Sequence, residues 1–90
     1  MQIGAHIIAK GIVQGVGFRY FVYLHAKRLG VAGCVRNLYN GNVEIDVEGD
    51  RAMVEALIKE VKIGPRSAQV KDLTIEWHEF KTQYEEFEIR

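Results

Sequence analysis

The stretch Gly11-Ile12-Val13-Gln14-Gly15-Val16-Gly17-Phe18-Arg19 marks the point where a short apolar segment gives way to a helical pattern. Gly15 and Gly17 have no Cβ, so the backbone is free to turn tightly and to approach a ligand closely. A chain that turns from a strand into a helix directs backbone N–H groups outward, where the helix N-terminus adds partial positive charge. Arg19 adds a planar guanidinium suited to phosphate or carboxylate. The stretch predicts an oxyanion site, most plausibly for phosphate, although two glycines alone are also typical of a simple tight turn.

The segments next to this stretch predict the first half of the fold. Residues 3–11 are apolar, short and end at glycine, which predicts a strand buried on both faces. From Phe18 apolar residues recur at helical spacing until Gly30, with cations in the last turn, which predicts an amphipathic helix. Residues 31–38 predict a second strand, and the Asn-Gly pair within residues 39–42 predicts a tight hairpin turn.

The second half begins with alternating residues. Within residues 43–48, Val, Ile and Val alternate with Glu, Asp and Glu, which predicts a strand with one buried face and one wet, acidic face. Asp50 is a suitable N-cap for a second helix, which carries an apolar stripe and ends at Gly64-Pro65. Glu55 and Lys59 are spaced for an ion pair on its exposed side.

Two further strands complete the chain. Residues 70–78 predict a strand with one apolar face, residues 81–84 a loop, and residues 85–90 a short strand with Phe87 and Ile89 pointing inward. The order is β-α-β-β-α-β plus a terminal strand. This order predicts an α+β fold, a ferredoxin-like split βαβ sandwich with two helices on one face of a mostly antiparallel sheet. We expect a single domain over residues 1–90.

Composition and charge limit the function. Hydrophobic residues make up 48% and charged residues 27%, a balance typical of a globular chain. Lys+Arg and Asp+Glu both number 12, which argues against a general nucleic-acid binder but not against one local anion site. Cys34 is the only cysteine, and no apolar run approaches the length of a membrane span or forms a secretion signal. We therefore expect a cytoplasmic protein that binds neither nucleic acid nor membrane.

Asn37 is the second candidate site residue. In a split βαβ fold the first and second strands run parallel, so they end at the same edge of the sheet. Asn37, near the end of the second strand, would then lie within reach of the glycine stretch. A neutral amide at that place is able to hold a water or a substrate oxygen by donating and accepting hydrogen bonds. From topology alone, it is an equally good interpretation that Asn37 only begins the hairpin turn.

The remaining polar residues are weaker candidates. His6, His25 and His78 share no metal-ligand spacing, so we expect no metal site. Cys34 has no histidine at a nucleophile spacing and is interpreted as packing. Glu44, Asp46 and Glu48 are interpreted as facing solvent, and Glu85 and Glu86 face opposite ways on a strand.

Two motifs resemble a known family. Residues 11–19 are similar to the first motif of the acylphosphatases, and Gly33-Cys34-Val35-Arg36-Asn37 is similar to their second. The resemblance continues through residues 40–44, 48–50, 64–68 and 87–89, in order and over essentially the whole chain. Cys34 and Ile12 depart from residues common in the family, and neither is a catalytic position.

The resemblance implies a metal- and cofactor-free hydrolase of small-molecule acyl phosphates. By that resemblance Arg19 binds the phosphoryl group together with backbone N–H groups, and Asn37 orients the attacking water. The N–H groups in question belong to the phosphate-binding loop Gly15, Val16, Gly17, Phe18 and Arg19. Inorganic phosphate is then both product and competitive inhibitor, and we expect a monomer. A carboxylate leaving group is stable at neutral pH, which fits a sequence without a convincing acid–base pair.

Two other classes of function remain as alternatives. An RNA-recognition domain has the same element order, but its stacking aromatics belong on the third strand, where this chain carries acidic residues. A non-catalytic anion-binding or regulatory acylphosphatase-like domain would keep the loop without turnover. An assay for acyl-phosphate hydrolysis separates all three.

Overall fold

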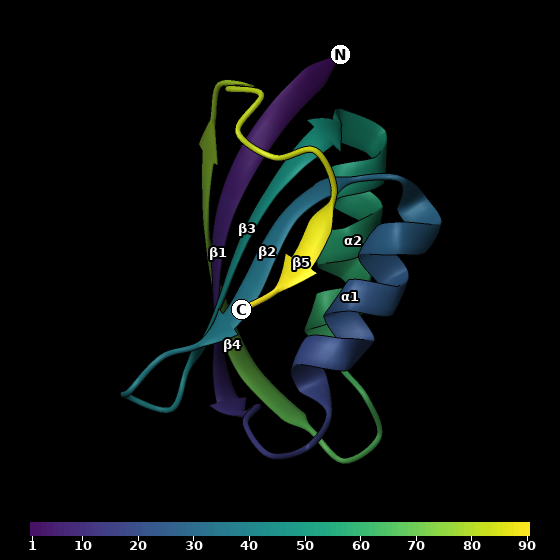
Figure 1. The fold of residues 1–90 in the computed structure, drawn as a ribbon. Helices are drawn as coiled ribbons and strands as arrows, with labels where there is room; N and C mark the ends of the chain where they lie inside the picture. The colour runs from purple at the N-terminus through teal and green to yellow at the C-terminus, as the bar shows by residue number, and fades with distance from the viewer.

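The computed structural model describes all 90 residues, which form a sheet with two helices on one face (Figure 1). Both helices pack on the same side of the sheet, as the sequence predicts. The elements in chain order are β1 (Gln2–Ile12), α1 (Phe18–Leu29), β2 (Ala32–Asn37), β3 (Val43–Asp50), α2 (Arg51–Ile63), β4 (Gln69–His78) and β5 (Phe87–Ile89). Neither helix has the length and hydropathy needed to cross a membrane.

The sheet has the strand order β4-β1-β3-β2-β5. β1 pairs antiparallel with both β3 and β4, and β2 pairs antiparallel with β3 and parallel with β5. This is the predicted ferredoxin-like arrangement with one added edge strand. Because β1 and β2 both run antiparallel to β3, they are parallel to one another and end at the same edge of the sheet.

The core lies between the sheet and the helices, where the predicted apolar stripes meet. The helical spacing of Phe18, Val22 and Ala26 places all three in the core. The alternation in β3 does the same for its apolar residues. The fully buried side chains from β1, β3 and α2 are Ala5, Ile7, Ala9, Val43, Ile45, Val47, Val54, Leu57 and Val61.

The helix ends follow the predicted signals, with one difference in pairing. α1 ends at Gly30, whose φ of 72° is left-handed, and α2 begins at Asp50, whose carboxylate accepts the Ala52 N–H at 3.2 Å. The predicted Glu55–Lys59 ion pair is not present. Glu55 instead contacts Arg51 one turn earlier, at 3.1 Å.

β1 is not buried on both faces, contrary to the prediction. Ala5, Ile7 and Ala9 face the helices, whereas His6 and Ile8 are only half-buried on the opposite face. We call this helix-free side the outer face. No second layer of helices covers it, so alternate residues of β1 keep partial contact with water.

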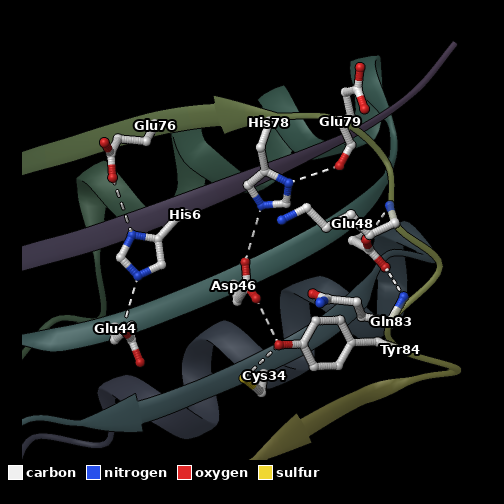
Figure 2. Close-up of polar contacts among 11 residues, drawn as sticks. His6, Cys34, Glu44, Asp46, Glu48, Glu76, His78, Glu79, Gln83 and Tyr84 are labelled. Atoms are coloured by element: carbon white, nitrogen blue, oxygen red, sulfur yellow. Dashed lines mark hydrogen bonds and ion pairs between the residues drawn. The ribbon is translucent and has the colours of Figure 1, made fainter.

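The outer face is nevertheless not a wet acidic surface (Figure 2). Glu48, predicted to face solvent, is only 1% exposed, and its two carboxylate oxygens accept the Lys81 N–H at 2.7 Å and the Gln83 N–H at 2.9 Å. Asp46 accepts the Tyr84 hydroxyl at 2.7 Å. These bonds hold residues 79–86, the strap between β4 and β5, against the outer face. The strap covers carboxylates that a single alternating strand would leave in water.

Candidate active site

The loop between β1 and α1, residues 13–17, contains two glycines in left-handed backbone conformations. φ is 73° at Gly15 and 76° at Gly17, and a Cβ at either position would have no atom within 4 Å. Backbone conformation, and not crowding, is therefore what requires glycine there. Gly17 is also the N-cap of α1 and has no side chain to cap the helix.

The N–H groups of this loop and of the first helical turn are unpaired within the protein. The first helical hydrogen bond runs from the Phe21 N–H to the Gly17 carbonyl at 3.0 Å. None of the backbone N–H groups from Gly15 to Tyr20 donates to an acceptor in the chain. Unpaired donors at a helix N-terminus, together with the helix dipole, favour a bound anion.

One pocket, of about 200 Å³, brings the predicted site residues together. Asn37 is the last residue of β2 and lies at the sheet edge where β1 also ends. The pocket therefore joins the loop to Asn37, as the topology argument predicts. Its lining residues are Val13, Gly15, Gly17, Phe18, Arg19, Tyr20, Asn37 and Ile89.

Within the predicted phosphate-binding loop, residues 15–19, Val16 is the one residue that does not line the pocket. Its side chain packs against the core instead. Its backbone N–H remains one of the unpaired donors of the loop.

The guanidinium of Arg19 has a single contact within the chain. Its Nη1 donates to the main-chain oxygen of Arg90 at 3.3 Å, a long hydrogen bond. A guanidinium has five N–H donors in a planar fork, so most of its donors are open toward the pocket and solvent. Arg19 follows Gly17 by two residues, which places this fork beside the loop N–H groups.

Three wall residues were missed by the sequence prediction: the buried Val13, which lies within residues 11–19, and two residues outside that stretch. Tyr20 is exposed at the start of α1, and Ile89 is 42% exposed at the end of β5, although it was predicted to point inward. Ile89 lies on the same side of its strand as the buried Phe87, because side chains alternate. At that end of β5 the space beside the strand is the pocket and not the core. No feature of the local sequence distinguishes these two situations.

Gln14 was also missed, although it lies within the quoted motif. Its Nε2 donates at 2.8 Å to the Leu38 carbonyl and at 2.8 Å to the Asn42 carbonyl. Its side chain therefore connects the loop to the turn that follows Asn37. A signal for this contact is absent from the sequence, because the two segments meet only in the folded sheet.

Several ionisable groups on the outer face are paired with one another. His6 contacts Glu44 at 2.9 Å, and His78 contacts Asp46 at 3.4 Å, both on the outer face (Figure 2). Hydrogen bonding from His6, and then from Arg36, lowers the pKa of Glu44 although partial burial opposes this shift. Arg19 and Tyr20 are the only ionisable residues that line the pocket, so neither a carboxylate nor an imidazole reaches it.

Cys34 lies beneath the strap. Its thiol is 3.7 Å from the Tyr84 hydroxyl, which in turn donates to Asp46. Burial, followed by the hydrogen bond to Asp46, raises the pKa of Tyr84. The thiol belongs to this polar cluster on the outer face and not to the pocket that Arg19 and Asn37 line, in agreement with the interpretation of Cys34 as packing.

Fold and pocket together define an α+β sandwich with an oxyanion-binding loop at the end of its first strand. The acylphosphatase family model matches residues 5–89. An acylphosphatase of Caldanaerobacter subterraneus subsp. tengcongensis is 44% identical over 89 residues, which are 99% of each chain. The crystal structure of acylphosphatase from Bacillus subtilis superimposes with a TM-score of 0.95 at 35% identity, over 98% of each chain. The chain belongs to the acylphosphatase family of enzymes, as its two motifs suggest.

The same fold also forms part of a much larger protein. Full-length HypF, in its phosphate- and nucleotide-bound form, matches with a TM-score of 0.87 at 31% identity. That match covers 100% of this chain but 12% of HypF. The unit is thus found both as the greater part of a small enzyme and as a minor part of a long chain.

Proposed function

We propose that this chain hydrolyses acyl phosphates, with the phosphoryl group bound by Arg19 and the Gly15–Arg19 loop and with the attacking water oriented by Asn37. The observation that supports this best is the shared pocket. It is lined by the Arg19 side chain, by loop glycines with unpaired N–H groups, and by Asn37 from a different strand. Few other ligands suit so many donors converging on so small a volume.

The donors match the charge that develops during phosphoryl transfer. Negative charge is spread over the equatorial oxygens of the phosphoryl group in the transition state. Fixed N–H groups and a guanidinium stabilise that charge without reorganising as the reaction proceeds. Glycine at positions 15 and 17 allows the left-handed backbone conformation of the loop, in which its N–H groups have no acceptor in the chain.

Hydrolysis needs a water on the side opposite the leaving carboxylate. The water oxygen forms a bond to phosphorus while the bond between phosphorus and the acyl oxygen breaks. The bonding electrons leave with the acyl oxygen, giving a carboxylate that is stable at neutral pH without protonation. The Asn37 amide holds the water by donating and accepting hydrogen bonds.

The proton of the water goes to the substrate in this proposal. No carboxylate or imidazole lines the pocket. A phosphoryl oxygen of the acyl phosphate is therefore the base, and the proton remains on the inorganic phosphate that is released. Because the product keeps the group that the loop binds, inorganic phosphate is expected to inhibit competitively. Every group in this mechanism comes from one chain, so a monomer is sufficient.

Hydrolysis of benzoyl phosphate, followed by absorbance, tests the proposal. We expect turnover by the unaltered protein and loss of both turnover and phosphate inhibition in Arg19→Ala. For Asn37→Ala we expect kcat to fall by about 10²–10³ while the Ki for phosphate is kept, because a positioning donor is removed. Arg28→Ala is the matched control, since Arg28 is an exposed arginine at the far end of the same helix.

Three results would contradict the proposal. Absence of turnover in the unaltered protein, with phosphate still bound, would favour the non-catalytic domain instead. Wild-type turnover in Asn37→Ala would remove its role with the water. Equal losses in Arg19→Ala and Arg28→Ala would show that charge alone, and not the pocket, matters.

A further inference from the structure

The side chain of Gln14 reaches from the loop to the turn that follows Asn37. Both hydrogens of its amide are used, one on the Leu38 carbonyl and one on the Asn42 carbonyl, each at 2.8 Å. Gln14 is half-buried and does not itself line the pocket. It therefore acts on the site only through the segment that it holds.

That segment is the turn between β2 and β3. The turn is closed by the Leu38 N–H, which donates to the Asn42 carbonyl at 2.9 Å, and by the Gly41 N–H, which donates to the Leu38 carbonyl at 3.2 Å. Gln14 thus bonds to the same two carbonyls that close the turn. The Gln14 side chain therefore holds both ends of the turn, Leu38 and Asn42, in place relative to the loop.

Asn37 immediately precedes this turn and depends on it for its position. On one side it is fixed by the sheet, where it pairs with Val43, and on the other by Leu38. Its exposed amide makes no hydrogen bond within the chain. The backbone on either side therefore sets the position from which the Asn37 side chain extends toward the loop.

We infer that Gln14 is a positioning residue that sets the distance between the Gly15–Arg19 loop and the Asn37 amide. The inference rests on the proposed function, in which the loop holds phosphorus and Asn37 holds the attacking water. The spacing between those two groups is the spacing between nucleophile and electrophile. A displacement of about 1 Å at such a place costs about 10² in rate.

The test is Gln14→Met, which keeps the length of the side chain but removes both donors. We expect kcat to fall by about 10–10², because the turn is no longer tied to the loop. The Ki for phosphate should stay within about twofold, because the loop and Arg19 are unchanged. Gln2→Met is the matched control, since Gln2 is an exposed glutamine at the opposite end of β1.

A double-mutant cycle with Asn37→Ala distinguishes positioning from general destabilisation. If Gln14 acts through Asn37, Gln14→Met should reduce kcat by less than about threefold once the Asn37 amide is absent. A full reduction on that background would overturn the inference, as would an unchanged kcat in the single variant. Rates are compared per mole of folded protein.

A second variant covers the case in which Gln14→Met does not fold. Gln14→Asn keeps the two donors on a shorter side chain that reaches at most one carbonyl, and a fall of about tenfold in kcat is expected. Wild-type kcat in Gln14→Asn, or in whichever variant folds, rejects the role of Gln14 alone. Failure of the unaltered protein or of Asn37→Ala to behave as proposed would instead reject the function itself.

Discussion

The loop at the end of β1 and the outer face of the sheet use their polar groups in opposite ways. In the loop, the N–H groups from Gly15 to Tyr20 have no acceptor in the chain, and Arg19 has one long contact. On the outer face the three carboxylates of β3 are all engaged, Glu44 by His6, Asp46 by Tyr84 and Glu48 by the strap (Figure 2). The hydrogen-bonded groups of the outer face hold the strap in place. The N–H groups of the loop, which have no acceptor in the chain, are available to a ligand.

This difference separates the effects that mutations should have. A change to the open guanidinium of Arg19 should reduce activity with little loss of stability, because that group has one long hydrogen bond within the chain. A change on the outer face should reduce stability with little loss of activity, because its partners lie within the chain and away from the pocket.

Replacing arginine by lysine should separate the two regions most clearly. Arg19→Lys should lower kcat/KM by about 10²–10³, because an ammonium is a point charge and does not reproduce the planar fork. Arg36→Lys, which alters the arginine beside Glu44 on the outer face, should leave kcat/KM within about twofold. Steady-state hydrolysis of benzoyl phosphate measures both. Similar losses of kcat/KM in the two variants would contradict the distinction between the loop and the outer face.

Two glycines with positive φ should differ in their cost to stability. A Cβ at Gly33 in β2 would lie 1.9 Å from the Asp46 carbonyl oxygen, whereas one at Gly15 would meet nothing within 4 Å. Gly33→Ala is expected to cost about 3 kcal/mol or more, since backbone crowding adds to the conformational strain. Gly15→Ala carries only the strain, about 1–2 kcal/mol. Urea unfolding of both variants measures the difference, and equal midpoints would contradict it.

Glu48→Gln tests whether the strap depends on its buried carboxylate. The side chain keeps its size, but the amide nitrogen cannot accept an N–H, so either Lys81 or Gln83 loses its acceptor. One buried unsatisfied donor costs about 1–3 kcal/mol. Hydrogen exchange should show faster exchange at one of these two amides, with kcat unchanged. Full protection of both amides would mean that the carboxylate does not hold the strap.

The smallest expected effect is the acid dependence of stability that Glu44 contributes. Its pKa is lower in the folded chain than the ordinary value of 4.5, through hydrogen bonds from His6 and Arg36. The unfolded chain then binds more protons, so this contribution is complete above the unfolded pKa and is lost as the pH falls through the folded one. Glu44→Gln should flatten the decline of unfolding free energy below about pH 4.5. If the unfolding free energy of Glu44→Gln falls with pH as steeply as that of the unaltered protein, carboxylates other than Glu44 cause the fall.

The fold followed from the sequence because its patterns are local. Helical spacing after Phe18, the Asn-Gly turn and the Asp50 cap each depend on neighbours a few residues away, and each is found in the structure. The prediction that Asn37 lies close to the loop also holds, because strand order and direction follow from the element order. Helix, turn and cap signals, together with the strand directions of the split βαβ order, were sufficient to predict these features.

Two of the mistaken predictions share a cause. Glu48 was expected in water and Ile89 in the core, and each has the opposite environment. Alternation along a strand tells which side a residue faces but not what covers that side. The strap covers Glu48, and the pocket opens beside Ile89. Both of these depend on segments distant in sequence.

The sequence by itself determined the α+β sandwich, the glycine loop with its arginine and the shared edge of Asn37, because these depend on periodicity, backbone conformation and strand order. The tertiary structure decided how the groups at that edge are held and enclosed. It ties Gln14 to the turn beyond Asn37, places Tyr20 and Ile89 on the pocket wall, and holds the strap over Glu48 on the outer face. Such contacts join residues far apart in the chain, and only packing brings them together.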